Sequence, residues 1–196
     1  MALLWCRCFL SEIWRNSDFA NGVLDNYHYF SIREGLQARP VPDKGSKSMI
    51  IRKMTIEDYD AVYGLWKRIK GFAMRSIDDS KEGVERFLLR NPDTSVVAWH
   101  EGRIVGAILC GHDGRRGCFY HVCVDPDYRM QGIGTKMVVF AMNALKKENI
   151  SKVSLIAFTQ NDVGNAFWRK IGWNQREDLN YYDFVLNRDN IEAFNQ

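Results

Sequence analysis

Cysteine is scarce in this chain and forms no motif typical of a disulfide framework or a zinc site. The 196 residues include five cysteines and four histidines, the cysteines are odd in number, and no two are spaced as C-x-x-C. The closest pair, Cys6 and Cys8, has no second ligand pair, and the histidines are scattered. This argues against a disulfide-stapled secreted domain and against a metal site. Three cysteines lie in apolar runs, where a thiol behaves as a small hydrophobic group, so we expect a reducing, cytoplasmic setting.

The chain also lacks a strong charge of one sign and a long apolar run. Its 27 basic and 24 acidic residues leave a net charge of +3, and the two signs are interspersed, so no basic stripe predicts nucleic-acid binding. The apolar start, residues 1–14, is interrupted by Arg7 and Glu12. It is too short for a membrane span and poor as a signal peptide. We therefore expect neither a nucleic-acid partner nor a membrane partner.

Length and composition indicate a single globular domain behind a leader. Hydrophobic residues make up 46% of the chain and charged residues 26%, which is ordinary for a domain with a sizeable core. Residues 39–48 contain two prolines, a glycine and two serines, as a linker does. We expect a loosely ordered N-terminal extension over residues 1–48, a domain over residues 49–187 and a C-terminal tail over residues 188–196. Met49 is an alternative start of the protein.

From Met49 onward, strand-like and helix-like patterns alternate at regular intervals. Helices are expected at 55–70 and 81–90, and a hairpin of strands at 95–99 and 103–111. A strand over 118–124, a helix from 133, a strand over 153–158 and a helix over 161–171 follow. Trp173 and residues 181–186 suggest closing strands. The order is β-α-α-β-β-β-α-β-α-β.

The most informative stretch is a strand, a glycine loop and a helix. The apolar run at 118–124 is ended by Asp125-Pro126, and Y-R-M-Q-G-I-G-T-K follows at 128–136. A helix start leaves about four backbone N–H groups without partners and carries roughly half a positive charge, so a loop there can hold a phosphate. Gly132 and Gly134 allow close approach of the main chain, Arg129 adds charge, and Thr135 adds a hydroxyl donor. A plain connecting loop is the alternative reading.

Two better-known phosphate motifs do not fit this loop. The dinucleotide fingerprint G-x-G-x-x-G requires a third glycine, and Met137 stands in its place. The mononucleotide loop requires G-x-x-x-x-G-K-[ST], and Gly134-Thr135-Lys136 lacks that spacing.

What remains, V-x-V-x-P-x-x-R-x-x-G-x-G-T over residues 122–135, resembles the signature of the GCN5-related N-acetyltransferase (GNAT) superfamily. A second stretch, residues 161–173, resembles the family's N-x-x-A-x-x-F-Y-x-x-x-G-F, and the likeness spans about residues 50–186. The resemblance to a bacterial-type acetyltransferase implies an α/β (α+β) fold, with a mixed central sheet of about six to seven strands and about four helices. It also implies acetyl-CoA as cosubstrate.

The resemblance assigns the acetyl-CoA contacts residue by residue. The strand main chain pairs with the pantetheine arm, the loop holds the diphosphate, the asparagine bonds the pantetheine, and the aromatic pair packs near the thioester. For Asn161, a helix cap is an equal alternative. The implied cofactor-binding residues are Val122, Cys123, Val124, Arg129, Met130, Gln131, Gly132, Ile133, Gly134, Thr135, Asn161, Phe167 and Trp168.

The catalytic groups are less well marked, because the tyrosine that often protonates the leaving thiolate in this family is here Trp168, which cannot supply that proton. An amine must lose a proton before it attacks a thioester, and His121 is the candidate base because it is the histidine of the core motif. Tyr120 and Tyr182 are candidate proton donors. Strand alternation places Tyr120 and His121 on opposite faces unless a bulge intervenes. A structural role for His121 remains an alternative, as does transfer by proximity without a base.

The sequence thus predicts an N-acetyltransferase that moves an acetyl group from acetyl-CoA to a primary amine by direct attack in a ternary complex. The acceptor is a small-molecule or peptide amine. A homodimer is left open, since dimers are common among such folds. Two alternatives are a regulatory module that binds acetyl-CoA but catalyses weakly, and a nucleotide-binding or structural domain with a chance glycine loop.

Overall fold

The computed structural model describes residues 48–195. Of the expected extension over residues 1–48, only Ser48 is described. Cys6 and Cys8 therefore lie outside the described residues. Among the helices of residues 48–195, none is both long and apolar enough to cross a bilayer.

A five-stranded sheet forms the centre of the domain, in the order β1-β3-β4-β5-β6. The first four strands in this order pair antiparallel, and β6 pairs parallel to β5. The strands are β1 (Ile50–Lys53), β3 (Val96–His100), β4 (Arg103–His112), β5 (Gly117–Val124) and β6 (Val153–Leu155). Because β1 and β6 are the edges, β4 and β5 lie inside the sheet, and β4 is buried along almost its whole length.

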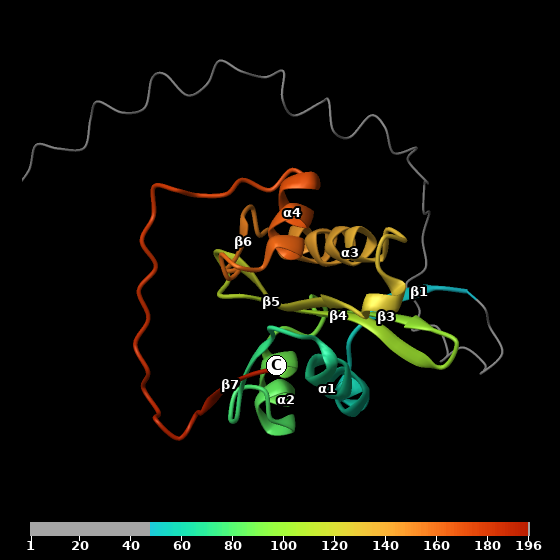
Figure 1. Cartoon of the computed structure of the whole chain (residues 1–196), viewed down its shortest axis with the longest axis horizontal. Helices are drawn as coiled ribbons and strands as arrows, with labels where there is room; N and C mark the ends of the chain where they lie inside the picture. Colours follow the sequence, from blue (N-terminus) through green and yellow to red (C-terminus); the bar gives the residue numbers. More distant parts are fainter. Residues whose placement is uncertain (1–47, 196) are drawn as a thin grey trace, which may run out of the picture. The chain divides into compact units, whose positions relative to one another are not determined.

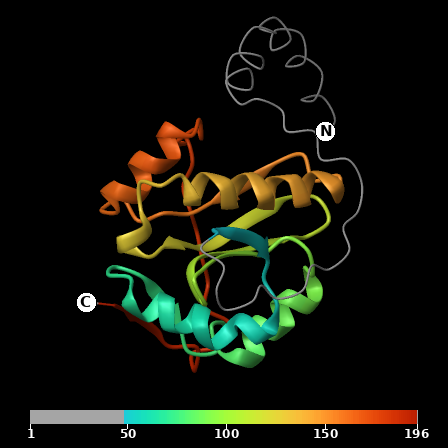
Figure 2. The same ribbon diagram turned by 90° about the vertical axis from the view of Figure 1, so that its right-hand side faces the viewer.

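Helices cover both faces of this sheet (Figures 1 and 2). One face carries α1 (Tyr59–Arg68) and α2 (Lys81–Arg90), and the other carries α3 (Ile133–Lys147) and α4 (Asp162–Lys170). Two apolar clusters result, one around Trp66 of α1 and one around Met137 of α3. Short 3-10 turns, η1 (Ile56–Asp58) and η2 (Pro126–Tyr128), precede α1 and α3.

Two of the four helices in the described residues, α2 and α4, begin at residues whose side chains cap them. Ser80 accepts a hydrogen bond from the Gly83 N–H at the start of α2, and Asn161 accepts one from the Gly164 N–H at the start of α4. Each cap satisfies one of the N–H groups that a helix start leaves free. The expected helices at 81–90, 133–147 and 161–171 are therefore confirmed to within a residue or two.

The C-terminal part differs from expectation. The α/β class is confirmed, but the seven strands divide into the five-stranded sheet and a separate antiparallel pair, β2 (Ala73–Arg75) with β7 (Glu192–Phe194). The residues expected as a tail thus supply a strand. The prediction of closing strands at Trp173 and 181–186 is wrong for this chain, because these residues form no ladder. They lie in an extended segment between α4 and β7, which stands away from β6 (Figure 1).

Candidate active site

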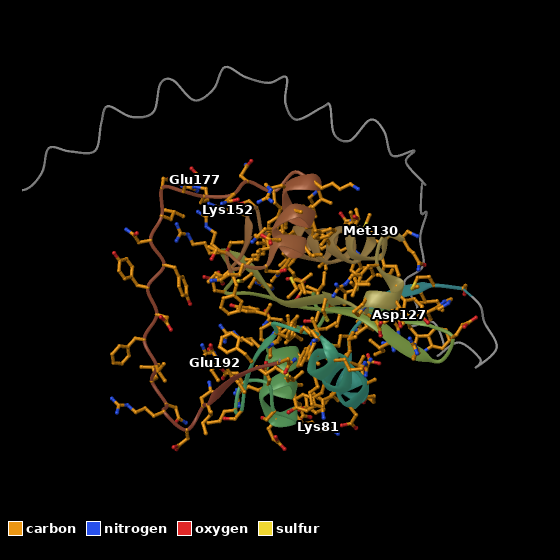
Figure 3. All side chains as sticks on the ribbon, in the orientation of Figure 1. Lys81, Asp127, Met130, Lys152, Glu177 and Glu192 are labelled. Carbon is orange, nitrogen blue, oxygen red and sulfur yellow. The ribbon has the colours of Figure 1, made fainter. Side chains whose placement is uncertain are left out.

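The glycine loop forms a backbone cradle at the start of α3. Met130 and Gly132 adopt left-handed backbone angles, with φ of 61° and 75°, and a Cβ at Gly132 would meet nothing within 4 Å. Within the described part of the chain, no hydrogen bond is recorded for the amide N–H groups from Met130 to Thr135. Figure 3 shows the Met130 side chain at this loop, just before α3. Free amides at a helix start are the donors that a phosphate group requires, so the cradle is able to hold a phosphate group.

Three contacts hold the cradle against the rest of the domain. Ile133 is buried in the α3 cluster, and a Cβ at Gly134 would come within 3.3 Å of the Phe167 ring. Gly134 thus permits close packing of α3 on α4. The Arg129 Nε donates to the Val124 carbonyl at 3.1 Å. The guanidinium is therefore anchored to the end of β5, while the side chain remains exposed. Gln131 and Thr135 complete the loop, exposed and half-buried respectively.

The strand β5 leaves one main-chain edge open beside this loop. It pairs with β6 over Gly117, Cys118 and Phe119 alone, whereas its other edge pairs with β4 as far as Val124. Val122 and Val124 pack on the α3 side of the sheet, and Cys123 packs on the α1 side. Burial raises the pKa of the Cys123 thiol to about 12, so this thiol is a neutral packing group. The open edge is the kind that an extended ligand can pair with.

A bulge in β5 places Tyr120 and His121 on the same face of the sheet. Tyr120 pairs with Leu109 and Cys123 with Ala107, so the strand holds one residue more than its partner. His121 takes a left-handed φ of 49°. Phe119 and Val122 pack with the α3 cluster, while the rings of both residues between them face α1 and α2. Strand alternation predicted that the two side chains could share a face only if the strand contained such a bulge, and the structure contains it.

The ring of His121 is packed between two aromatic rings and bonded to a carboxylate. Its ring lies 4.7 Å from Trp66 and 4.9 Å from Phe72, and its side chain is 18% exposed. Its Nε2 lies 2.6 Å from Asp79 Oδ1. The carboxylate accepts this hydrogen bond, so in the neutral ring Nε2 carries the proton and Nδ1 has the lone pair.

Asp79 is fixed in turn by the segment between β2 and α2. Its Oδ2 accepts from the Arg75 N–H at 2.7 Å, and its carbonyl accepts from the Tyr59 hydroxyl at 2.9 Å. Only 5% of the residue is exposed. Sequence reasoning missed Asp79, which lies 42 residues before His121 in a polar stretch that suggests only a loop. Only the chain topology brings the two together.

Tyr120 occupies the outer part of the same face. It is half exposed, and its ring meets Phe87 of α2 edge-on at 5.9 Å. Burial of the hydroxyl raises its pKa, and the neighbouring Cys118 adds to the shift. Tyr120 therefore keeps its proton at neutral pH, and its hydroxyl can donate a hydrogen bond. The tyrosine forms part of a hollow of about 390 Å³. The hollow is lined by Phe87, Arg90, Asn91, Gly111, His112, Asp113, Arg116, Gly117, Cys118, Tyr120 and Ser154.

The residues of the second motif lie on α4, where they form a packed aromatic group. The Trp168 ring lies 5.0 Å from Phe167, 4.8 Å from Trp173 and 6.4 Å from Phe119 of β5. This group attaches α4 to the part of β5 that still pairs with β6. Asn161 serves as the N-terminal cap of α4, the alternative given for it, and its amide nitrogen has no recorded partner among residues 48–195.

Tyr182 is not brought to the other candidate residues. It lies in the extended segment after α4 and is 84% exposed. The structure thus gathers His121 and Tyr120 on one face, adds Asp79, and leaves Tyr182 outside. Among the described residues, no group of three or more histidine, cysteine or acidic side chains is arranged to hold a metal ion.

Comparison with known proteins matches most of this domain. The profile of the acetyltransferase (GNAT) family matches residues 59–173. An acetyltransferase of Sodalis glossinidius is 30% identical over 67% of this chain and 91% of the relative. An acetyltransferase of Pectobacterium atrosepticum is 32% identical over 63% of this chain and 86% of the relative. The residues matched by the family profile include the cradle, the bulged strand and the aromatic group of α4.

Solved structures share the fold at lower identity. AAC(6')-Iy, in complex with the bisubstrate analogue CoA-S-monomethyl-acetylneamine, gives a TM-score of 0.57 at 16% identity, over 70% of this chain and 99% of that one. A predicted acetyltransferase from Clostridium acetobutylicum, determined with acetyl-CoA, gives a TM-score of 0.53 at 22% identity. That match covers 69% of this chain and 96% of the other.

Proposed function

Because this chain belongs to the acetyltransferase (GNAT) family, we propose that it is an N-acetyltransferase that uses acetyl-CoA and acetylates a primary amine in a ternary complex. The observation that carries the proposal is the cradle of free amides from Met130 to Thr135, next to the open edge of β5. The cradle offers donors for a diphosphate, and the open edge offers main-chain partners for an amide-containing arm. The two features lie end to end, as the parts of coenzyme A do.

The reaction requires a neutral amine, and His121 is the group that we assign to remove its proton. An alkyl amine with an ordinary pKa near 10.4 is almost fully protonated at pH 7. Asp79 holds the Nε2 proton of His121, so Nδ1 can accept the amine proton. The amine nitrogen then bonds to the thioester carbonyl carbon, the carbon–sulfur bond breaks, and the thiolate leaves. Tyr120 can donate a hydrogen bond to the departing sulfur, and the thiolate then takes a proton from solvent.

Two arginines and one carboxylate, Asp113, line the hollow, so its charge favours acceptors that carry an anionic group. Arg90 and Arg116 both line it, and neither has an ion pair within residues 48–195. Unpaired guanidinium groups bind carboxylates well, often through two hydrogen bonds. We therefore expect amino acids and peptides with acidic groups to be better acceptors than polycationic amines. The distribution of cysteines supports action in a reducing cytoplasm.

Two measurements test the function in sequence. Thermal unfolding with acetyl-CoA, ATP or NAD tests the cradle, because a ligand at 100 times its Kd adds about 2.7 kcal/mol of stability. We expect acetyl-CoA alone to raise Tm, and no shift at millimolar acetyl-CoA would remove the proposal. Release of free thiol is then followed with amino acids, N-terminal peptides, polyamines and aminoglycosides. Binding without thiol release for any amine would favour the regulatory alternative, a module that binds acetyl-CoA but does not transfer its acetyl group.

A further inference from the structure

The end of the described chain packs against the segment that carries Asp79. We call residues 189–195, which include β7, the C-terminal brace. Among the described strands, β2 pairs with β7 alone, and a two-stranded pair is marginally stable by itself. The Arg75 guanidinium of β2 also forms an ion pair with the Glu192 carboxylate of β7. The brace lies on the same side of the central sheet as α1 and α2 (Figures 1 and 2). The position of β2, and of the turn that follows it, therefore depends on the brace.

Asn190 fixes the turn between β2 and α2. Its Oδ1 accepts hydrogen bonds from the Ile77 N–H at 2.9 Å and from the Asp78 N–H at 3.3 Å. Its Nδ2 donates to Asp78 Oδ2 at 2.7 Å. These partners allow one orientation of the amide, because only its oxygen can accept from two N–H groups. Three bonds from one side chain restrict this turn, and Asp79 is the next residue.

The first residue of the turn bonds to the brace through three atoms. The Ser76 N–H donates to the Ile191 carbonyl at 2.9 Å. The Ser76 hydroxyl donates to the Asp189 carbonyl at 2.9 Å and accepts from the Ile191 N–H at 2.9 Å. Each of residues 75–78 therefore bonds to the brace, and Asp79 follows them directly.

The far end of the brace holds the two residues whose rings flank His121. The Asn195 Nδ2 donates to the carbonyls of Trp66 at 2.7 Å and Ile69 at 3.0 Å. These carbonyls lie at the end of α1, where a helix leaves such groups without partners. The Asn195 N–H also donates to the Phe72 carbonyl at 3.0 Å. The rings of Trp66 and Phe72 are those that lie 4.7 and 4.9 Å from the His121 ring.

We propose that Asn190 and Asn195 are positioning residues, which hold the Asp79 carboxylate and the two aromatic rings where they orient His121. Two constraints are needed, because the carboxylate determines which ring nitrogen carries the proton, and the aromatic rings determine the plane of the imidazole. Each asparagine acts through the backbone of another element. The effect on rate rests on the proposed function, whereas the positioning of His121 does not.

An exchange of donor and acceptor tests the contact of Asn190. The Asn190→Asp variant places a second carboxylate against Asp78, so repulsion between like charges replaces a hydrogen bond. Adding Asp78→Asn restores the bond with the donor and the acceptor exchanged. The single variant should therefore displace the turn, and the double variant should recover it. Ile191→Ala is the control, because Ile191 lies in the same segment and its side chain is 66% exposed.

The first readout is the imidazole proton, which requires no substrate. The Nε2 proton of His121 is bonded to Asp79 at 2.6 Å. In full-length protein labelled with nitrogen-15 histidine, it should give an N–H signal that exchanges slowly with water. The signal is identified by its loss in His121→Gln. It should lose most of its intensity in Asn190→Asp, return in the double variant and persist in Ile191→Ala.

The second readout is the rate of acetyl transfer. Asn190→Asp should lower kcat roughly 5-fold, as Asp79→Asn does. It should leave the KM for acetyl-CoA unchanged, because the cradle belongs to α3 on the other face of the sheet. In the His121→Gln background it should cost nothing further, since the two residues act as a unit. Asn195→Asp, which places a carboxylate against two carbonyls, should behave like Asn190→Asp. Asp58→Asn, on another segment, should lose stability in chemical unfolding but keep both the signal and kcat.

Three results would overturn the proposal. One is a wild-type protein without the His121 signal. Another is a folded Asn190→Asp variant whose signal and kcat match those of the wild type, and the third is a folded double variant that recovers neither. If the signal follows the brace but no amine is acetylated, the positioning role stands and the proposed function fails, so the two are tested apart.

Discussion

The contact between His121 and Asp79 allows a quantitative test of catalysis. If His121 accepts the amine proton, its replacement by glutamine should lower kcat/KM by about 10²- to 10⁴-fold, the usual contribution of a general base. The acidic limb of the pH profile, where an imidazole gains a proton, should disappear. Glutamine is preferred to alanine, because alanine would leave a void between the Trp66 and Phe72 rings.

Asp79→Asn should have a smaller effect on rate. The amide oxygen still accepts the hydrogen bond from Nε2, but it carries no charge, and a charge-assisted bond is roughly twice as strong as a neutral one. A loss of about 1 kcal/mol corresponds to roughly a 5-fold decrease in kcat/KM. In the His121→Gln background, Asp79→Asn should cost little more, because residues that act as a unit are not additive.

Stability must be measured in parallel, since Asp79 also accepts the Arg75 N–H. If the amide nitrogen turns toward that donor, the fold loses about 1–3 kcal/mol. Asp58→Asn is the matched control. Asp58 is also buried, bonds the Arg52 guanidinium at 2.7 Å and accepts the Thr55 N–H at 3.0 Å. The Asp58→Asn variant should lose a similar free energy of unfolding, measured by chemical denaturation, and should keep the kcat of the wild type.

Two outcomes would refute this reasoning. If His121→Gln has the same pH profile of kcat/KM as the wild type, His121 is not the base, and transfer proceeds by proximity or through another group. If Asp79→Asn and Asp58→Asn have equal activity, the carboxylate of Asp79 only supports the fold.

Three further predictions concern the cradle, the hollow and the core. Gly132→Ala should lower the free energy of unfolding by about 1–2 kcal/mol, because Gly132 has φ of 75°. The same change should distort the cradle and raise the Kd for coenzyme A at least 10-fold, as measured by calorimetry. Gly114→Ala, with φ of 87° at the far end of β5, should lose similar stability and keep its affinity. Arg116→Glu should raise KM for an acidic acceptor more than for a neutral one. Arg115 lies at the same turn but outside the hollow, so Arg115→Glu should change neither KM. Equal KM values in both variants would contradict the role assigned to Arg116. Burial raises the pKa of the Cys110 thiol to about 12 from an ordinary 9.0. The unfolded thiol therefore loses its proton first, and stability that is complete below pH 9 falls by about 1.4 kcal/mol per pH unit as pH rises toward 12. Cys110→Ala should reduce the alkaline slope in urea unfolding by that amount, and an unchanged slope would show that Cys110 does not cause it.

The cradle could be predicted from sequence because all of its determinants are local. An apolar strand, Asp125-Pro126, two glycines and a helical pattern follow one another within about 20 residues. These features act on their own stretch of backbone, as Asp125-Pro126 does by ending the strand and Gly132 by permitting a left-handed angle. The order of helices and strands followed for the same reason.

The catalytic face could not be predicted to the same extent, because it depends on contacts between distant segments. Neither the extra residue of the β5 bulge nor the approach of Asp79 to His121 has a marker in the local sequence. The bulge is defined by how Leu109 and Ala107 pair with β5, and the Asp79 contact depends on α2 lying across that strand. A periodicity that assigns alternate residues to alternate faces therefore fails at Tyr120 and His121.

Residues 181–186 show a third relation between sequence and structure, in which the local pattern is strand-like but the described part of the chain provides no partner. These residues carry apolar side chains at successive positions, as a strand covered on both faces does, yet they form no ladder. Trp173 packs against Phe119 and Trp168 before this stretch, and β7 pairs with β2 after it. A ladder is a property of two segments, so the pattern of one segment can predict an extended backbone but cannot predict its pairing. The prediction of closing strands failed for this reason.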